Sequence, residues 1–124
     1  MEKSIYEALF DWVRQDHREI KALVSRLLEA EDSDKRKGLV NELHHASLPH
    51  MIAEEEVFYQ PLSRDNAAWQ EAFTGTEQHH RIRMLLDELL ETPATTARFM
   101  GKVAALSEIF DLHFSVEEKA VFSH

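Results

Sequence analysis

The sequence predicts an all-α protein, an up-down-up-down antiparallel four-helix bundle that forms a single domain over residues 1–124. Three observations lead to this prediction. The chain contains only three Gly and three Pro, so it has few turn residues. Apolar residues recur at spacings of three and four along four long stretches, as they do on one face of a helix. The connections between these stretches are short, and short connections join antiparallel neighbours in bundles.

The first helix is expected over about residues 5–30 and the second over about residues 34–62. Ser4 and Glu7 have the spacing of a capping box, and Pro61 with the polar cluster after it ends the second helix. The inward stripe of the first helix is Leu9, Val13, His17, Ile20, Val24 and Leu27. The inward stripe of the second is Leu39, Leu43, Ala46, His50, Ala53 or Glu54, and Val57.

The third helix is expected within about residues 66–91 and the fourth over about residues 95–122. Gly75 is a candidate break in the third helix, with Thr74 and Glu77 as a second capping box. The third stripe is Ala72 or Phe73, His79, Ile82, Leu86, and Leu89 or Leu90. The fourth is Phe99, Val103, Leu106, Phe110, His113, Glu117, and Val121 or Ala120. Since the third stripe passes through His79 and not through His80, His79 should face the core.

Charge and composition exclude several classes of function. The formal charge of −9 disfavours nucleic acid and anionic membranes as partners, because both need clustered Lys and Arg. The absence of Cys excludes disulfides and thiolate metal sites. The N-terminal residues lack a signal-peptide apolar segment, and no apolar run reaches membrane-spanning length, so a cytoplasmic location is expected.

The most informative feature is a set of six polar residues on the four apolar stripes. A His is followed four residues later by a Glu in two places, at His50–Glu54 and at His113–Glu117. Residues at this spacing lie one above the other on a helix, roughly 6 Å apart along the axis. In the predicted bundle, His17 and His79 can lie in one layer with these pairs. The chain also reads as two related halves, because His50 follows His17 by 33 residues and His113 follows His79 by 34.

A metal site explains these six residues better than ion pairs do. Burying ionisable groups without partners is costly, and no Lys or Arg falls on the stripes. Nitrogen and oxygen donors without sulfur suit iron, manganese or zinc. The six donors could fill one octahedral ion, or serve two ions bridged by the carboxylates at roughly 3.5–4 Å. The repeat of the two halves favours two ions.

The motifs that contain these residues resemble the hemerythrin-like, HHE cation-binding domain family from about residue 10 onward. They are Asp16-His17-x-x-Ile20, His50-x-x-x-Glu54-Glu55 with Phe58-Tyr59-x-Pro61-Leu62, His79-x-x-Ile82, and His113-x-x-x-Glu117-Glu118 with Val121-Phe122. The resemblance implies a four-helix bundle with two iron ions, Fe2+ or Fe3+, bridged by carboxylates and an oxo or hydroxo group; zinc or manganese is the alternative. The implied ligands are His17, His50, Glu54, His79, His113 and Glu117.

The third helix departs from the oxygen-carrying members of that family. Those members have a His-x-x-x-His on this helix, whereas Gly75 and Arg83 stand four residues either side of His79 here. Glu55, Glu118 and His80 are the candidates for a replacement ligand, although their helix faces are unfavourable. Glu55 and Glu118 are alternatively solvated residues or residues that orient a His ligand. Tyr59 is interpreted as a packing residue rather than a redox relay, and a position close to the irons is the alternative to check.

These features lead to the hypothesis of a non-haem di-iron protein that binds, senses or reacts with O2, peroxide or nitric oxide, or that senses or handles iron. Two alternatives stay open: a di-iron enzyme that consumes peroxide or nitric oxide, and a bundle whose metal, such as zinc, is purely structural. The expected partner is a small diatomic or peroxide ligand, with no nucleic acid and no membrane. A homo-oligomer, or a separate signalling partner for a sensing role, is compatible with the sequence.

Overall fold

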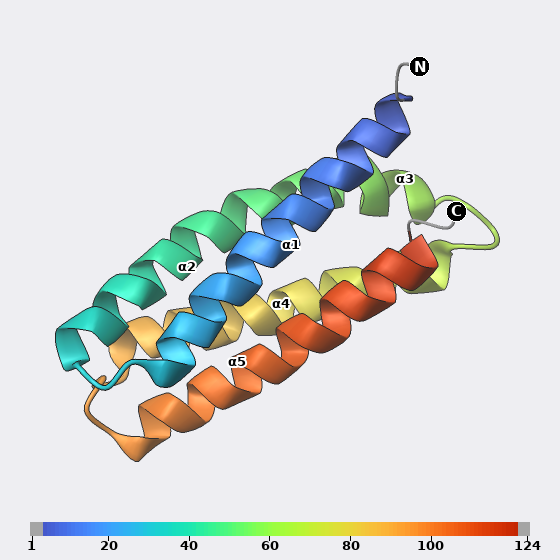
Figure 1. The fold of residues 1–124 in the computed structure, drawn as a ribbon. Coiled ribbons are helices and arrows are strands. Elements are labelled where there is room, and N and C mark those ends of the chain that lie inside the picture. The colour runs from blue at the N-terminus through green and yellow to red at the C-terminus, as the bar shows by residue number, and fades with distance from the viewer. Residues whose placement is uncertain (1–3, 122–124) are drawn as a thin grey trace.

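The computed structural model describes residues 4–121, and four long helices dominate it (Figure 1). The long helices are α1 (Ile5–Glu29), α2 (Ser33–Glu54), α4 (Trp69–Glu91) and α5 (Ala97–Val116). Two π-helical segments, η1 (Glu55–Tyr59) and η2 (Glu117–Val121), continue α2 and α5, and the short α3 (Gln60–Leu62) follows η1. Within residues 4–121 all regular structure is helical, so the all-α four-helix prediction is confirmed.

Side chains cap the helices where the chain changes direction. Ser4 Oγ accepts a hydrogen bond from the backbone N–H of Glu7 at 3.1 Å. Asp32 and Thr96 do the same for the third residue after each of them, at 2.9 and 3.2 Å. These bonds satisfy backbone donors that have no partner within the first helical turn. Each cap therefore fixes the start of a long helix.

The four long helices enclose an apolar interior that consists of a large and a small cluster of buried residues. α1 packs against α2 and α5, and α4 packs against the same two helices. The loop between α1 and α2 is linked to the loop between α4 and α5. The Arg36 guanidinium donates hydrogen bonds to the carbonyls of Ala30 and Ala94, at 2.8 and 2.7 Å. Among the described residues, no helix is both long enough and apolar enough to cross a bilayer.

The expected break at Gly75 is wrong. α4 runs unbroken from Trp69 to Glu91, so Thr74 and Glu77 do not cap a new helix. A Gly inside a helix costs only about 1 kcal/mol relative to Ala, and the packing of one face of α4 outweighs this. Of the paired alternatives on this helix, Ala72 and Leu89 are buried, whereas Phe73 and Leu90 are exposed.

The inward placement of Val57 is also wrong, since this side chain is 45% exposed. The reason is η1, whose wider turn inserts one residue into the helical repeat. Phe58 and Tyr59 consequently take the inward positions. The alternatives at Ala120 and Val121 fall on side chains outside those that the structure describes.

The fold yields a first prediction, for the variant Leu106→Ala. The Leu106 side chain is fully buried in the core, so its truncation should reduce the free energy of unfolding by about 2–5 kcal/mol. Leu112→Ala is the matched control on the same helix, because Leu112 is 56% exposed and its loss should cost about 0.5 kcal/mol or less. Urea unfolding followed by circular dichroism measures both, and equal losses would contradict this description of the core.

Candidate metal centre

The six polar residues of the apolar stripes meet inside the bundle, and each is at most 2% exposed. They come from all four long helices and from η2. Their donor atoms form two groups, each with all atoms within 4.8 Å of one another. The first group is His17, His50, Glu54 and Glu117; the second is Glu54, His79, His113 and Glu117. Both carboxylates belong to both groups.

Each carboxylate divides its two oxygens between the groups. Glu54 Oε2 lies 3.2 Å from His50 Nε2, and Glu54 Oε1 lies 3.1 Å from His79 Nε2. Glu117 Oε1 lies 2.9 Å from His17 Nε2. Its other oxygen, Oε2, lies 3.2 Å from His113 Nε2. Both carboxylates thus have the orientation that bridges two neighbouring positions.

The four imidazoles are held from behind by oxygen acceptors. His50 Nδ1 lies 2.9 Å from Asp16 Oδ2, and His17 Nδ1 lies 3.2 Å from Glu118 Oε1. In the other half, the corresponding contacts are His79 with Glu55 at 2.9 Å and His113 with Gln78 at 2.7 Å. Because these oxygens only accept, each Nδ1 carries the hydrogen. In the neutral imidazole, Nε2 then presents a lone pair to the centre.

This chemistry fits a cation. His79 Nε2 and His113 Nε2 lie only 2.9 Å apart, and two lone pairs at that distance repel unless a positive charge lies beside them. The buried atoms His50 Nε2, Glu54 Oε2 and Glu117 Oε1 lie within 3.2 Å of an oppositely charged or polar partner, but in the described part of the chain none of them has a well-aligned hydrogen bond. Buried polar atoms of this kind need an explanation, and a coordinated ion supplies one.

When no cation is bound, protons must supply part of the positive charge that the two buried carboxylates need. Burial lowers the pKa of His17, but Glu117 and Glu54 outweigh this effect and raise it to about 9. The same balance raises the pKa of His113 to about 9. Burial raises the pKa of Glu54, yet its hydrogen-bonding neighbours in the cluster hold it well below the usual range. The metal-free centre is therefore a cluster of imidazolium and carboxylate groups, in which metal ions compete with protons.

Tyr59 is a further member of the centre, and it also packs in the core as expected, in a cluster with Val13, Phe58 and Ala72. Its hydroxyl donates a hydrogen bond to Glu117 Oε2 and lies 3.3 Å from His113 Nε2. The side chain is 2% exposed. Burial, together with the negative charges of Glu117 and Glu54, raises the pKa of Tyr59, so the metal-free form is a neutral phenol. The α-helical repeat does not indicate this contact, because Tyr59 faces the centre only through the π-turn of η1.

The contacts behind the imidazoles repeat in the two halves of the chain. Glu55 and Glu118, each directly after a buried Glu, contact the His of the opposite half. Asp16 and Gln78, each directly before a stripe His, contact the His of the next long helix. Glu55 also pairs with Arg83 at 2.8 Å, and although partial burial raises its pKa, these contacts keep that pKa low. Sequence reasoning assigned no role to Asp16 or Gln78.

His80 does not belong to the centre. Its side chain is exposed on α4, whereas the neighbouring His79 is fully buried. The choice between these two adjacent residues from helical spacing is therefore confirmed.

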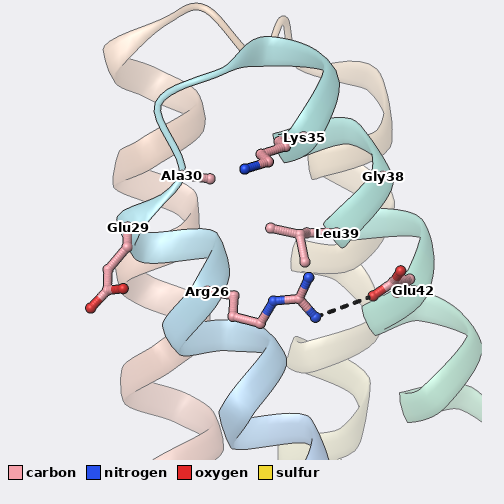
Figure 2. Close-up of a pocket in the computed structure, with 7 residues that line it drawn as sticks. All are labelled: Arg26, Glu29, Ala30, Lys35, Gly38, Leu39 and Glu42. Carbon is pink, nitrogen blue, oxygen red and sulfur yellow. Dashed lines mark ion pairs between the residues drawn. The ribbon is translucent and has the colours of Figure 1, made fainter.

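One hollow lies away from the centre, between the end of α1 and the start of α2. Its volume is about 410 Å³, and Figure 2 shows charged side chains around it, with Arg26 reaching toward Glu42 at 3.9 Å. It contains none of the six clustered residues. We assign no function to it.

One family model matches nearly the whole chain. Residues 8–124 match the model of the hemerythrin HHE cation-binding domain. The chain is also 24% identical over 113 residues to a protein of Nostoc sp. named DNA nickase. That match covers 91% of this chain but only 32% of the relative, so this chain spans about a third of that protein's length. No solved structure matches the chain.

The centre predicts which histidines retain metal. His113→Ala should lower the content of bound metal, because it removes a buried nitrogen donor. His80→Ala should leave the content unchanged, because its ring is exposed on α4 and points away from the cluster. Elemental analysis of both variants, purified side by side, measures the difference. Equal metal loss in the two variants would show that His80, and not His79, is the ligand on α4.

The contacts behind the imidazoles lead to a separate prediction, for the adjacent residues Glu55 and Glu56. Glu55→Gln should weaken metal binding about 10–100-fold, because it replaces the carboxylate that accepts from His79 and pairs with Arg83. Glu56→Gln is the matched control, since Glu56 is exposed and lies outside the cluster. Competition with a chromophoric chelator measures both affinities. An unchanged affinity in Glu55→Gln would refute the orienting role.

Proposed function

Because the chain belongs to the hemerythrin HHE cation-binding domain family, we propose that it is a non-haem di-iron protein that binds, senses or reacts with O2, peroxide or nitric oxide, or that senses or handles iron. The observation that carries this proposal is the shared pair of carboxylates, each with one oxygen toward each His pair. One six-coordinate ion would not need carboxylates oriented in this way. Two ions side by side would.

The ligands in this proposal are the six residues of the cluster. One ion would be held by His17, His50, Glu54 and Glu117, and the other by Glu54, His79, His113 and Glu117. Nitrogen and carboxylate donors suit iron, and zinc or manganese is the less favoured occupant. When bound, a pair of iron ions supplies one-electron chemistry and open positions for a small ligand. The protein contributes the fixed donors, each of which is at most 2% exposed.

The up-down-up-down antiparallel order belongs to the same proposal. It is supported by the short connections at residues 30–32 and 92–96, and by the course of the ribbon in Figure 1. This order also places the four stripe histidines at one height, which the shared donor groups require.

The two-ion assignment gives a graded prediction. Wild-type protein loaded anaerobically with ferrous iron should bind about two ions per chain, and exposure to air should produce the absorption of an oxygen-bridged ferric pair. His50→Ala should retain about one ion, because the other group keeps its four donors. Glu54→Ala should lose most of both ions, because Glu54 belongs to both groups. Iron analysis and absorption spectroscopy measure these outcomes.

A wild-type stoichiometry of one ion would contradict the two-ion assignment, and the absence of both bound iron and the ferric absorption would contradict the function. Steady-state assays of peroxide and nitric oxide consumption separate an enzyme from a stoichiometric binder or sensor. A structural zinc bundle would instead show zinc retention with no reaction toward these molecules. Chelation should lower the melting temperature in every case, because a ligand of the folded state stabilises it.

A further inference from the structure

We propose, on the basis of the di-iron function above, that the hydroxyl oxygen of Tyr59 is an additional protein ligand to one of the two ions. The ion concerned is the one assigned to Glu54, His79, His113 and Glu117. Tyr59 would then supply the donor that the third helix lacks, and the two ions would differ in their protein ligands.

The position of the hydroxyl carries this inference. It contacts Glu117 Oε2 and lies 3.3 Å from His113 Nε2, and both atoms face the second donor group. The ring centroids of Tyr59 and His79 lie 5.2 Å apart, so the phenol stands among three of that group's four residues. An ion held by these residues would lie within reach of the oxygen. Oxygen donors of this kind suit ferric iron.

The absence of a side chain at Gly75 leaves space for the phenol ring of Tyr59. A Cβ atom added at Gly75 would lie 2.7 Å from Tyr59 Cζ and 2.9 Å from its hydroxyl oxygen. Gly75 stands on α4 one turn before His79, on the same face. A side chain at this position, including a second histidine, would displace the tyrosine. Only one of the two can serve the ion.

The π-helical turn η1 places the tyrosine correctly. In an α-helix, the residue four positions after Glu54 would share its face, and this residue is Phe58. The wider turn of η1 brings Tyr59 inward as well. In the second half of the sequence, the residue five positions after Glu117 is Phe122, which has no donor oxygen. The first ion therefore gains no equivalent ligand from this position.

Coordination would convert the phenol into a phenolate. The O–H bond breaks, the proton passes to solvent, and the oxygen donates an electron pair to the ion, with no change in oxidation state. The exogenous small ligand would then be directed to the ion of His17 and His50, which has one protein donor fewer. A hollow of about 210 Å³ borders Tyr59 on its outer side, so Phe is a better replacement than a small residue that would open the centre to it.

Spectroscopy of the iron-loaded protein tests this inference. The ferric wild type should show a visible phenolate-to-iron charge-transfer band, with phenolate ring vibrations in its resonance Raman spectrum. Tyr59→Phe should lose both signals while it retains about two iron ions per chain. Tyr6→Phe is the matched control, because Tyr6 is the other tyrosine of the sequence, and it should retain the signals.

A second variant moves the phenol without removing it. Gly75→Ala ordinarily favours a helix, but here the added Cβ must displace the Tyr59 ring, so the band should shift or disappear. If wild-type protein binds two iron ions without phenolate vibrations, or if Tyr59→Phe keeps them, this inference fails while the di-iron function stands. If wild-type protein binds no iron, both fail together.

Discussion

The structure depends on one electrostatic constraint, namely that two carboxylates and four imidazoles share the same buried space. Glu54 and Glu117 are at most 1% exposed, and like charges so close in a protein interior cannot persist without compensating positive charge. Protons on the imidazoles provide that charge when no cation is bound, as the raised pKa values of His17 and His113 show. Metal ions can provide it with greater geometric precision. The requirement that all four helices present a donor at one height follows from this constraint.

The two π-turns are the local consequence. Both begin at, or directly after, a buried Glu: η1 at Glu55, after Glu54, and η2 at Glu117 itself. A π-turn is less favourable than an α-turn and is concentrated at functional sites, where it changes which residues face inward. In the first half it brings Tyr59 to the centre and turns Val57 to solvent. The irregular backbone therefore lies where the polar interior begins, and it decides which side chains reach the centre.

The sequence was sufficient to predict the helices and the six inward donors, because both follow from a spacing that α-helical geometry dictates. It separated His79 from His80 on this basis alone. The same regular spacing misplaced Val57, since an α-helical repeat contains no information about a turn that widens by one residue. The continuity of α4 through Gly75 was likewise missed, because the packing of one face of this helix outweighs the low helix propensity of glycine. The partners Asp16 and Gln78 depend on contacts between helices.

The two donor groups, similar in their ligands, differ in the charge behind them. His17 and His50 rest on the carboxylates of Glu118 and Asp16. In the other group, Arg83 neutralises the carboxylate behind His79, and the partner of His113 is the uncharged amide of Gln78. Carboxylates make an imidazole a stronger donor than an amide does. A phenolate at the second ion would offset this difference, so that the asymmetry of the surroundings and the asymmetry of the ligands balance each other.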